Sequence, residues 1–102
     1  MSATYRITPR ALEDLKGIGR YTLQIWGREQ RDRYLRALDR RFAWLAENPR
    51  MGRQRDDIKP GYYSYPHKSH VVFYLIHDGG IDIIGVPHGR IDILNYFVGD
   101  DE

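Results

Sequence analysis

The chain has 102 residues, of which 41% are hydrophobic and 13% aromatic, so we expect one folded domain with a single core. The net charge is only +2, and the absence of cysteine excludes both a disulfide scaffold and a thiolate metal site, which fits a reducing cytoplasm. The N-terminal segment lacks the apolar stretch of a signal peptide, and the longest apolar run, residues 71–76, is too short to cross a bilayer. We therefore expect a cytoplasmic protein without membrane contact, with one domain over residues 1–98 and an acidic tail over residues 99–102.

The first predicted elements are a short strand and a helix. Residues 4–8 alternate apolar and polar side chains, which is typical of a strand. Thr8 and Pro9 predict the start of a helix, because a hydroxyl caps the first amides and proline lacks an amide that would be left unpaired there. This helix should bury one apolar stripe made of Leu12, Leu15, Ile18, Thr22 and Ile25.

A second helix is predicted directly after the first. Trp26 and Gly27 indicate the end of the first helix, since glycine accepts the left-handed conformation found there. The second helix should run from about residue 29 to residue 47, where Asn48–Pro49 ends it. Its apolar stripe consists of Leu35, Leu38, Phe42 and Leu45. Because the link is so short, the two helices should form an antiparallel hairpin.

The second half of the chain reads as a loop followed by strands. Residues 48–61 have a loop composition, and the period then changes from 3.6 to 2. Residues 61–70 suggest a strand with Pro66 near its end or at an edge, and residues 69–78 a strand in the middle of the sheet. A turn at residues 78–80 leads to a partner strand at 81–88, and one or two helical turns should begin at Ile91. The order predicts an α+β fold, β-α-α-β-β-β, with the helix hairpin packed on a mainly antiparallel sheet.

Basic residues are concentrated in the predicted helices. Twelve of the 16 Lys and Arg residues lie between Arg10 and Arg55, whereas eight of the 14 acidic residues lie outside that block. A solvated helix face is the simple interpretation of such a run. The preference for arginine also fits a surface that binds an acidic protein or a nucleic acid.

The polar motifs give weak support to catalysis. The four histidines have no ligand spacing for zinc, and no serine stands in the strand-to-helix turn that a serine hydrolase needs. RNA cleavage by a set such as His88, Arg90, Lys68 and Tyr96 is the serious chemical alternative. An ion pair between Arg90 and Asp92 would leave the last strand without a free cation, because residues 79–89 supply no second one. The tyrosines at 62–65 could stack on bases, although cross-strand packing explains them equally.

Four stretches, at residues 5–15, 21–38, 45–64 and 69–92, carry a family resemblance over nearly the whole chain. Their combined motifs are Trp26-Gly27, Asn48-Pro49-x-x-Gly52-Arg53, Gly61-Tyr62, Ser69-His70 with Tyr74, and His88-x-Arg90-x-Asp92. In this combination and order the chain resembles the ParE toxins, within the RelE/ParE superfamily of bacterial type II toxin–antitoxin systems.

The resemblance implies a toxin without enzymatic activity that poisons DNA gyrase and is neutralised by a ParD-like antitoxin. It also implies that the toxin contacts operator DNA only through the antitoxin. The antitoxin would lay an amphipathic helix over the helix hairpin and a strand against the sheet. Two alternatives are a RelE-like, ribosome-dependent mRNA endonuclease and a degenerate toxin that serves only as antitoxin partner and co-repressor. The RelE alternative is weakened by the last strands, which lack the several basic residues of that branch.

We expect two sets of site residues and no catalytic residue, metal or cofactor. The first set should bind the antitoxin and consists of Arg28, Arg31, Tyr34, Arg36, Leu38, Arg40, Arg41 and Trp44. The second set forms a functional cluster at the end of the last strand and consists of His70, His88, Arg90, Asp92 and Tyr96. In this cluster Asp92 should act as a cap or pair with Arg90, and His88 should end the strand near His70.

Overall fold

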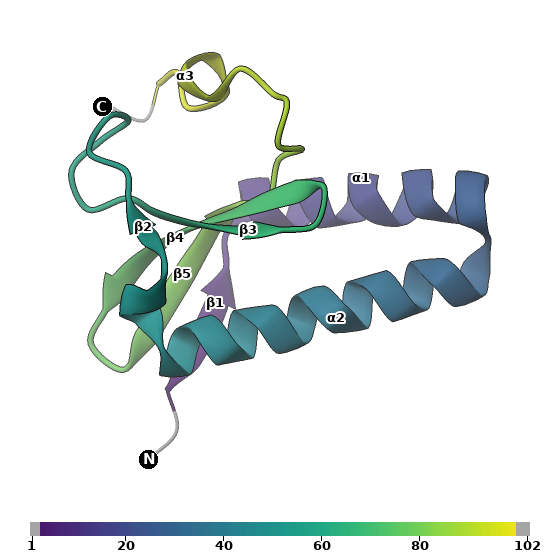
Figure 1. Cartoon of the computed structure of the whole chain (residues 1–102), viewed down its shortest axis with the longest axis horizontal. Helices are drawn as coiled ribbons and strands as arrows, with labels where there is room; N and C mark the ends of the chain where they lie inside the picture. Colours follow the sequence, from purple (N-terminus) through teal and green to yellow (C-terminus); the bar gives the residue numbers. More distant parts are fainter. Residues whose placement is uncertain (1–2, 100–102) are drawn as a thin grey trace.

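The computed structural model describes residues 3–99 and confirms the predicted α+β fold (Figure 1). Two long helices lie side by side and extend beyond a five-stranded sheet, and the short C-terminal helix lies apart from them (Figure 1). The helices are α1 (Pro9–Trp26), α2 (Arg28–Glu47) and α3 (Ile93–Tyr96), with a 3-10 turn η1 at Pro49–Met51. The strands are β1 (Thr4–Ile7), β2 (Arg53–Gln54), β3 (Tyr63–His67), β4 (His70–His77) and β5 (Gly80–Gly85).

The helix hairpin begins and turns where the sequence predicts. The Thr8 hydroxyl accepts a hydrogen bond from the amide of Ala11 at 3.4 Å, and Pro9 occupies the first turn of α1. Gly27 lies between the two helices with φ of 91°, a conformation that a residue with a side chain adopts only under strain. The one-residue link therefore turns the chain back on itself, and α1 packs against α2 as an antiparallel pair.

The sheet has the order β1-β5-β4-β3-β2 and is antiparallel except at one edge. β1 pairs with β5 in parallel, with Tyr5 opposite Ile81 and Ile7 opposite Ile83. β4 is central, as predicted, and pairs with β3 and β5. Pro66 lies at the edge of the paired region, because β2 pairs only with Tyr63 and Ser64.

Both faces of the sheet are covered. Alternation along β4 sends Val72 and Tyr74 to the helix side and Phe73 to the opposite side, and all three are fully buried. On the helix side, Leu38, Phe42 and Leu45 of α2 pack with Ile81 and Ile83 of β5. On the opposite side, Phe73 packs with Tyr62, Ile84 and Phe97, so the C-terminal segment supplies part of this second core.

Three local predictions were wrong. The predicted loop 48–61 contains η1 and the two-residue strand β2, a strand too short for a periodic pattern to reveal. In α1 the expected stripe members Leu12 and Ile25 are 45% and 54% exposed: Ala11 takes the inward position at the start of the helix, and Ile25 lies in the last turn, where the helix hairpin extends beyond the sheet (Figure 1). The helical turn expected from Ile91 begins at Ile93, after the cap residue Asp92.

In the predicted acidic tail, residues 99–102, the structure describes Gly99, and residues 100–102 lie outside the described part of the chain.

Within residues 3–99, no helix combines the length and the apolar character that crossing a membrane would require.

Candidate functional site

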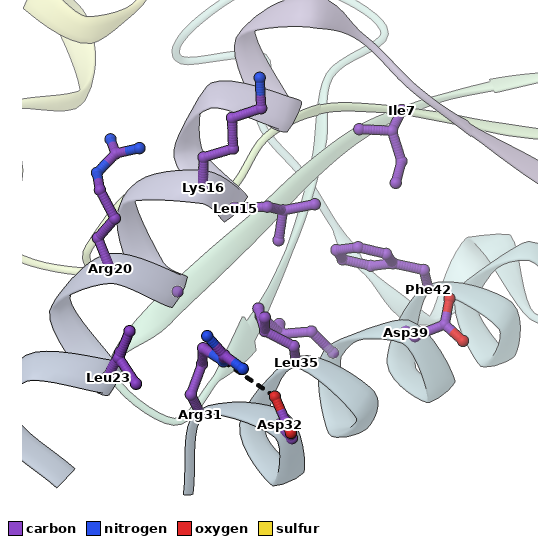
Figure 2. Close-up of a pocket in the computed structure, with 12 residues that line it drawn as sticks. Ile7, Leu15, Lys16, Arg20, Leu23, Arg31, Asp32, Leu35, Asp39 and Phe42 are labelled. Carbon is purple, nitrogen blue, oxygen red and sulfur yellow. Dashed lines mark hydrogen bonds and ion pairs between the residues drawn. The ribbon is translucent and has the colours of Figure 1, made fainter. Parts of the chain in front are cut away.

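A groove runs between α1 and α2 on the surface of the helix hairpin (Figure 2). Its volume is about 660 Å³. Leu15, Leu35 and Phe42 point toward one another in the groove, and Ile7 at the end of β1 closes it beside Phe42 (Figure 2). We call this surface, whose remaining lining residues are Lys16, Gly19, Arg20, Leu23, Arg31, Asp32, Leu38 and Asp39, the hairpin groove.

The rim of the hairpin groove carries three basic side chains, Lys16, Arg20 and Arg31, and two acidic ones, Asp32 and Asp39. Lys16 and Arg20 are exposed along α1, and Arg31 projects from α2 (Figure 2). Arg31 is held by an ion pair with Asp32, whose Nε to Oδ1 distance is 2.9 Å. The groove thus combines an apolar floor with a charged rim of net charge +1 and ends at the exposed edge strand β1.

A second concave surface lies on another side of α1, between that helix and the turn that joins β3 to β4. It has a volume of about 830 Å³. Helix α1 contributes Asp14 and Tyr21, the turn contributes Lys68, the start of β4 contributes His70, and Tyr96 comes from the C-terminal segment. We call this surface, whose lining residues also include Glu13, Trp26, Gln30, Tyr34, Ser69, Pro87, His88 and Ile91, the strand-end cleft.

One wall of the strand-end cleft is built from aromatic rings that tie α2 to the sheet. The Tyr34 hydroxyl lies 2.8 Å from Nδ1 of His70, and the rings of His70 and His88 meet edge to face with centroids 5.6 Å apart. His70 and His88 also form an isolated antiparallel bridge just beyond β5. Burial lowers the pKa of His70 below its ordinary value, and the neighbouring His88 and His67 lower it further, against an opposing effect of Asp14.

The floor of the cleft contains a carboxylate that links three elements. Oδ2 of Asp14 accepts a hydrogen bond from the amide of Val86 at 2.8 Å and another from the hydroxyl of Tyr96. Asp14 lies on α1, Val86 follows β5 and Tyr96 ends α3. These two bonds fix the C-terminal segment against the helix hairpin and position Tyr96 at the cleft.

The residues expected to bind an antitoxin do not form one continuous surface. Arg31 lines the hairpin groove, whereas Tyr34 lines the strand-end cleft. Arg41 and Trp44 stack on each other and on Tyr65 of β3, with the Arg41 guanidinium 4.9 Å from the Trp44 ring centre. The exposed arginines of the set that line neither surface are Arg28, Arg36 and Arg40. Leu38 is 1% exposed and belongs to the core, and it also lines the floor of the hairpin groove, so its contact with an antitoxin stays a prediction.

The strand-end residues divide into two groups. His70, His88 and Tyr96 line the strand-end cleft together, whereas Arg90 and Asp92 are not among its lining residues. Asp92 caps α3 by accepting a hydrogen bond from the amide of Asn95, in agreement with one of the two roles expected for it. His88 lies beside His70, as predicted, but in an isolated bridge three residues beyond the end of β5 at Gly85 rather than at the end of the strand.

Sequence reasoning missed the residues through which α1 shapes both surfaces. Leu23 and Arg20 line the hairpin groove, while Tyr21 and Trp26 line the strand-end cleft. Tyr21 and Trp26 are 63% and 68% exposed, and such large aromatic side chains outside the predicted stripe were a usable signal. Asp14 carries no comparable signal, because its partners lie more than 70 residues away.

Among residues 3–99, no group of three or more His, Asp or Glu side chains is arranged to hold a metal ion.

Comparison with known proteins places the chain in a family. Residues 5–93 match the sequence model described as ParE toxin of type II toxin-antitoxin system, parDE. The chain belongs to the ParE toxin family. A ParE1 toxin of Mycobacterium tuberculosis (strain H37Rv) is 39% identical over 94 residues, covering 91% of this chain and 96% of the relative.

Two further ParE toxins support the same assignment. Toxin ParE1 of Caulobacter vibrioides is 39% identical over 84 residues, which cover 82% of this chain and 86% of the relative. Toxin ParE of Escherichia coli is 31% identical over 91 residues, or 88% of each chain. As a member of this family, the chain is the toxin component of a type II toxin–antitoxin system.

A solved structure shares the fold. A chain from a structure titled "Chromosomal ParDE TA system from P. aeruginosa" superposes with a TM-score of 0.72. The match covers 84% of this chain and 95% of the other, at 16% sequence identity. The two chains therefore share a fold at low sequence identity.

Proposed function

We propose that this ParE-family toxin poisons DNA gyrase and that a ParD-like antitoxin holds it inactive in the cytoplasm. The observation that carries the antitoxin half of the proposal is the hairpin groove, with its apolar floor and its charged rim of net charge +1. Family membership supports the gyrase half. Operator DNA would be bound by the antitoxin and reached by the toxin only through it.

The hairpin groove has the chemistry needed for an amphipathic helix. Leu15, Leu35 and Phe42 offer apolar contacts to one face of such a helix, and Lys16 and Arg20 lie where acidic residues on its flank would meet them. The groove ends at Ile7 in β1, the edge strand of the sheet. An antitoxin segment could therefore continue from the groove as a strand paired with β1, whose outer edge has free backbone groups.

We further propose that the toxin has no enzymatic activity of its own. The hydroxyl of Tyr96 is engaged by Asp14, and Nδ1 of His70 by Tyr34, so both groups already serve structural bonds. Cleavage of RNA also needs cations around the phosphate. Among the described lining residues of the strand-end cleft, Lys68 is the one basic side chain besides the histidines.

The test adds the purified toxin to DNA gyrase, ATP and plasmid, followed by detergent and protease to release trapped cleavage complexes. Linear DNA that requires both proteins is the expected result, and adding the antitoxin should abolish it. A matched reaction should replace gyrase by translating ribosomes and follow a defined mRNA.

Each other outcome identifies an alternative. Cut mRNA without linear DNA would establish the ribosome-dependent endonuclease and overturn the proposal. A folded toxin that binds the antitoxin but gives neither product would be a degenerate toxin acting as co-repressor. Linear DNA in the absence of gyrase would reveal a nuclease in the toxin itself.

A further inference from the structure

We propose that the strand-end cleft is a second binding site, separate from the hairpin groove, and that it takes a basic side chain of a partner protein. The occupant is an arginine or a lysine presented on an exposed segment. This inference goes beyond the proposed function, because neither antitoxin binding in the hairpin groove nor gyrase poisoning requires it.

The first argument is the composition of the cleft walls. Tyr21 and Trp26 are exposed by 63% and 68%, although they lie beside a concavity of about 830 Å³. Tyr34 and Tyr96 line the same cleft from α2 and from the C-terminal segment. Exposed tryptophan and tyrosine around a concave surface are typical of the energetic centre of protein interfaces. Their ring faces also attract cations, arginine in particular.

The second argument is charge. The charged side chains that line the cleft are Glu13, Asp14 and Lys68, so two carboxylates and one ammonium group give a net charge of −1 with the histidines neutral. The whole chain, in contrast, carries +2. A concave surface of the opposite sign in a basic protein favours a cationic ligand over an anionic one.

The carboxylates are placed to receive that ligand. The hydrogen bonds that Asp14 receives from Val86 and Tyr96 both end on Oδ2, and the second carboxylate oxygen, Oδ1, is the atom that would accept bonds from a guanidinium group. Glu13 stands one residue earlier on α1 with its side chain 68% exposed, and its contact with Lys16 is a surface ion pair of 3.3 Å. Such exposed pairs are weak and exchange readily for a better partner.

The cleft is independent of the hairpin groove. Among the described residues, the two surfaces have no lining residue in common, although α1 contributes to both. Leu15, Lys16 and Leu23 line the groove, while Asp14, Tyr21 and Trp26 line the cleft. A ligand in the cleft is therefore compatible with a helix in the groove.

The experiment follows Trp26 fluorescence in the Trp44→Phe variant, which leaves Trp26 as the sole tryptophan. The probe is the peptide acetyl-Arg-Arg-amide, compared with acetyl-Glu-Glu-amide and adenosine monophosphate. We expect a saturable change in emission with the arginine peptide only.

Variants connect the signal to the cleft. Glu13→Gln combined with Tyr21→Ala should weaken binding about fivefold. Glu29→Gln is the matched control, because this exposed carboxylate on α2 does not line the cleft. Circular dichroism of each variant verifies the fold.

The outcomes separate this proposal from the proposed function. Retained peptide binding in the toxin–antitoxin complex would support two independent sites, whatever the gyrase assay shows. No saturable change, equal binding to both peptides, or tighter binding of the nucleotide would overturn the basic side chain as ligand. Unchanged affinity in the Glu13→Gln/Tyr21→Ala variant, or loss of peptide binding in the complex, would overturn the separate cleft.

Discussion

At the scale of single residues, Tyr74 connects the centre of the sheet to the chain that leaves α2. Its side chain is fully buried and its ring stacks on Tyr63 with centroids 5.6 Å apart. The hydroxyl donates to the carbonyl of Pro49 at 2.6 Å and accepts from the amide of Gly52 at 3.0 Å. Burial is the main reason that its pKa rises to about 12, so the hydroxyl stays protonated and keeps its donor at every pH at which the protein works.

Replacing Tyr74 by Phe should therefore destabilise the protein without opening a cavity. The change leaves the carbonyl of Pro49 and the amide of Gly52 without their partner, which should lower the free energy of unfolding by about 1–3 kcal/mol. Urea denaturation followed by circular dichroism measures it. Tyr21→Phe is the matched control, because Tyr21 is 63% exposed and should change stability little. Equal stabilities of both variants would contradict the buried hydrogen bonds.

Two histidines beside Tyr34 make stability depend on pH. Burial is the main cause that lowers the pKa of His67 and of His70 below the ordinary 6.5, and the buried Nε2 of His67 has no hydrogen-bond partner among the described residues. In the unfolded chain both should titrate near that ordinary value. Between the lower folded pKa and the unfolded pKa, the unfolded state binds more protons, so acidification favours unfolding.

The contribution of neutral His67 and His70 to the free energy of unfolding should be fully present above about pH 6.5. It should be lost progressively as the pH falls toward the lower pKa values of these two side chains in the folded protein. Urea titrations at several pH values between about 5 and 8 measure this slope. The double variant His67→Gln/His70→Gln should show a shallower dependence over that window. An identical slope in the double variant would assign the acid sensitivity to other groups.

At the scale of elements, the C-terminal segment acts as the cover of the second sheet face. Phe97 is 5% exposed and meets the rings of Tyr62 and Phe73 at centroid distances of 5.2 and 5.1 Å. The guanidinium of Arg10 lies 4.6 Å from the centre of the Phe97 ring. A single aromatic side chain thus joins α1, β4 and the end of the described chain.

Phe97→Ala should lower the free energy of unfolding by about 3 kcal/mol, because it removes buried area and leaves a cavity against Phe73. Thermal and urea unfolding measure the loss, and Val98→Ala, at a position that is 74% exposed, is the neighbouring control. If both variants unfold alike, the segment does not contribute to the second core.

The elements also show how far a sequence can predict such a fold. Local signals were sufficient for the helix hairpin, because Thr8, Pro9 and Gly27 act through the backbone nearest to them. The parallel pairing of β1 with β5 joins residues about 75 positions apart, and no local pattern encodes it. For the same reason, the cluster His70–His88 could be predicted from neighbouring strands, whereas the bond from Tyr96 to Asp14 could not.

At the scale of the whole molecule, the arginine-rich block should act on a partner before contact occurs. Arg36 and Arg40 are exposed on α2 but do not line the hairpin groove, so their expected contribution is to the electrostatic field around it. Such long-range attraction changes the rate of association, whereas lost contacts change the rate of dissociation. The two effects can be separated within this one helix hairpin.

The double variant Arg36→Glu/Arg40→Glu should slow association with the antitoxin about tenfold at low salt, with a difference that shrinks as salt screens the field. Leu23→Asp in the hairpin groove should instead accelerate dissociation, since Leu23 lines the groove and is 40% exposed. Surface plasmon resonance at several salt concentrations measures both rates. Lys59→Glu/Lys68→Glu, off the helix hairpin, changes the net charge equally and should slow association less. If the Lys59→Glu/Lys68→Glu control slows association as strongly, the overall charge of the toxin, rather than the helix hairpin, attracts the antitoxin. An unchanged dissociation rate in Leu23→Asp would place the bound antitoxin outside the hairpin groove.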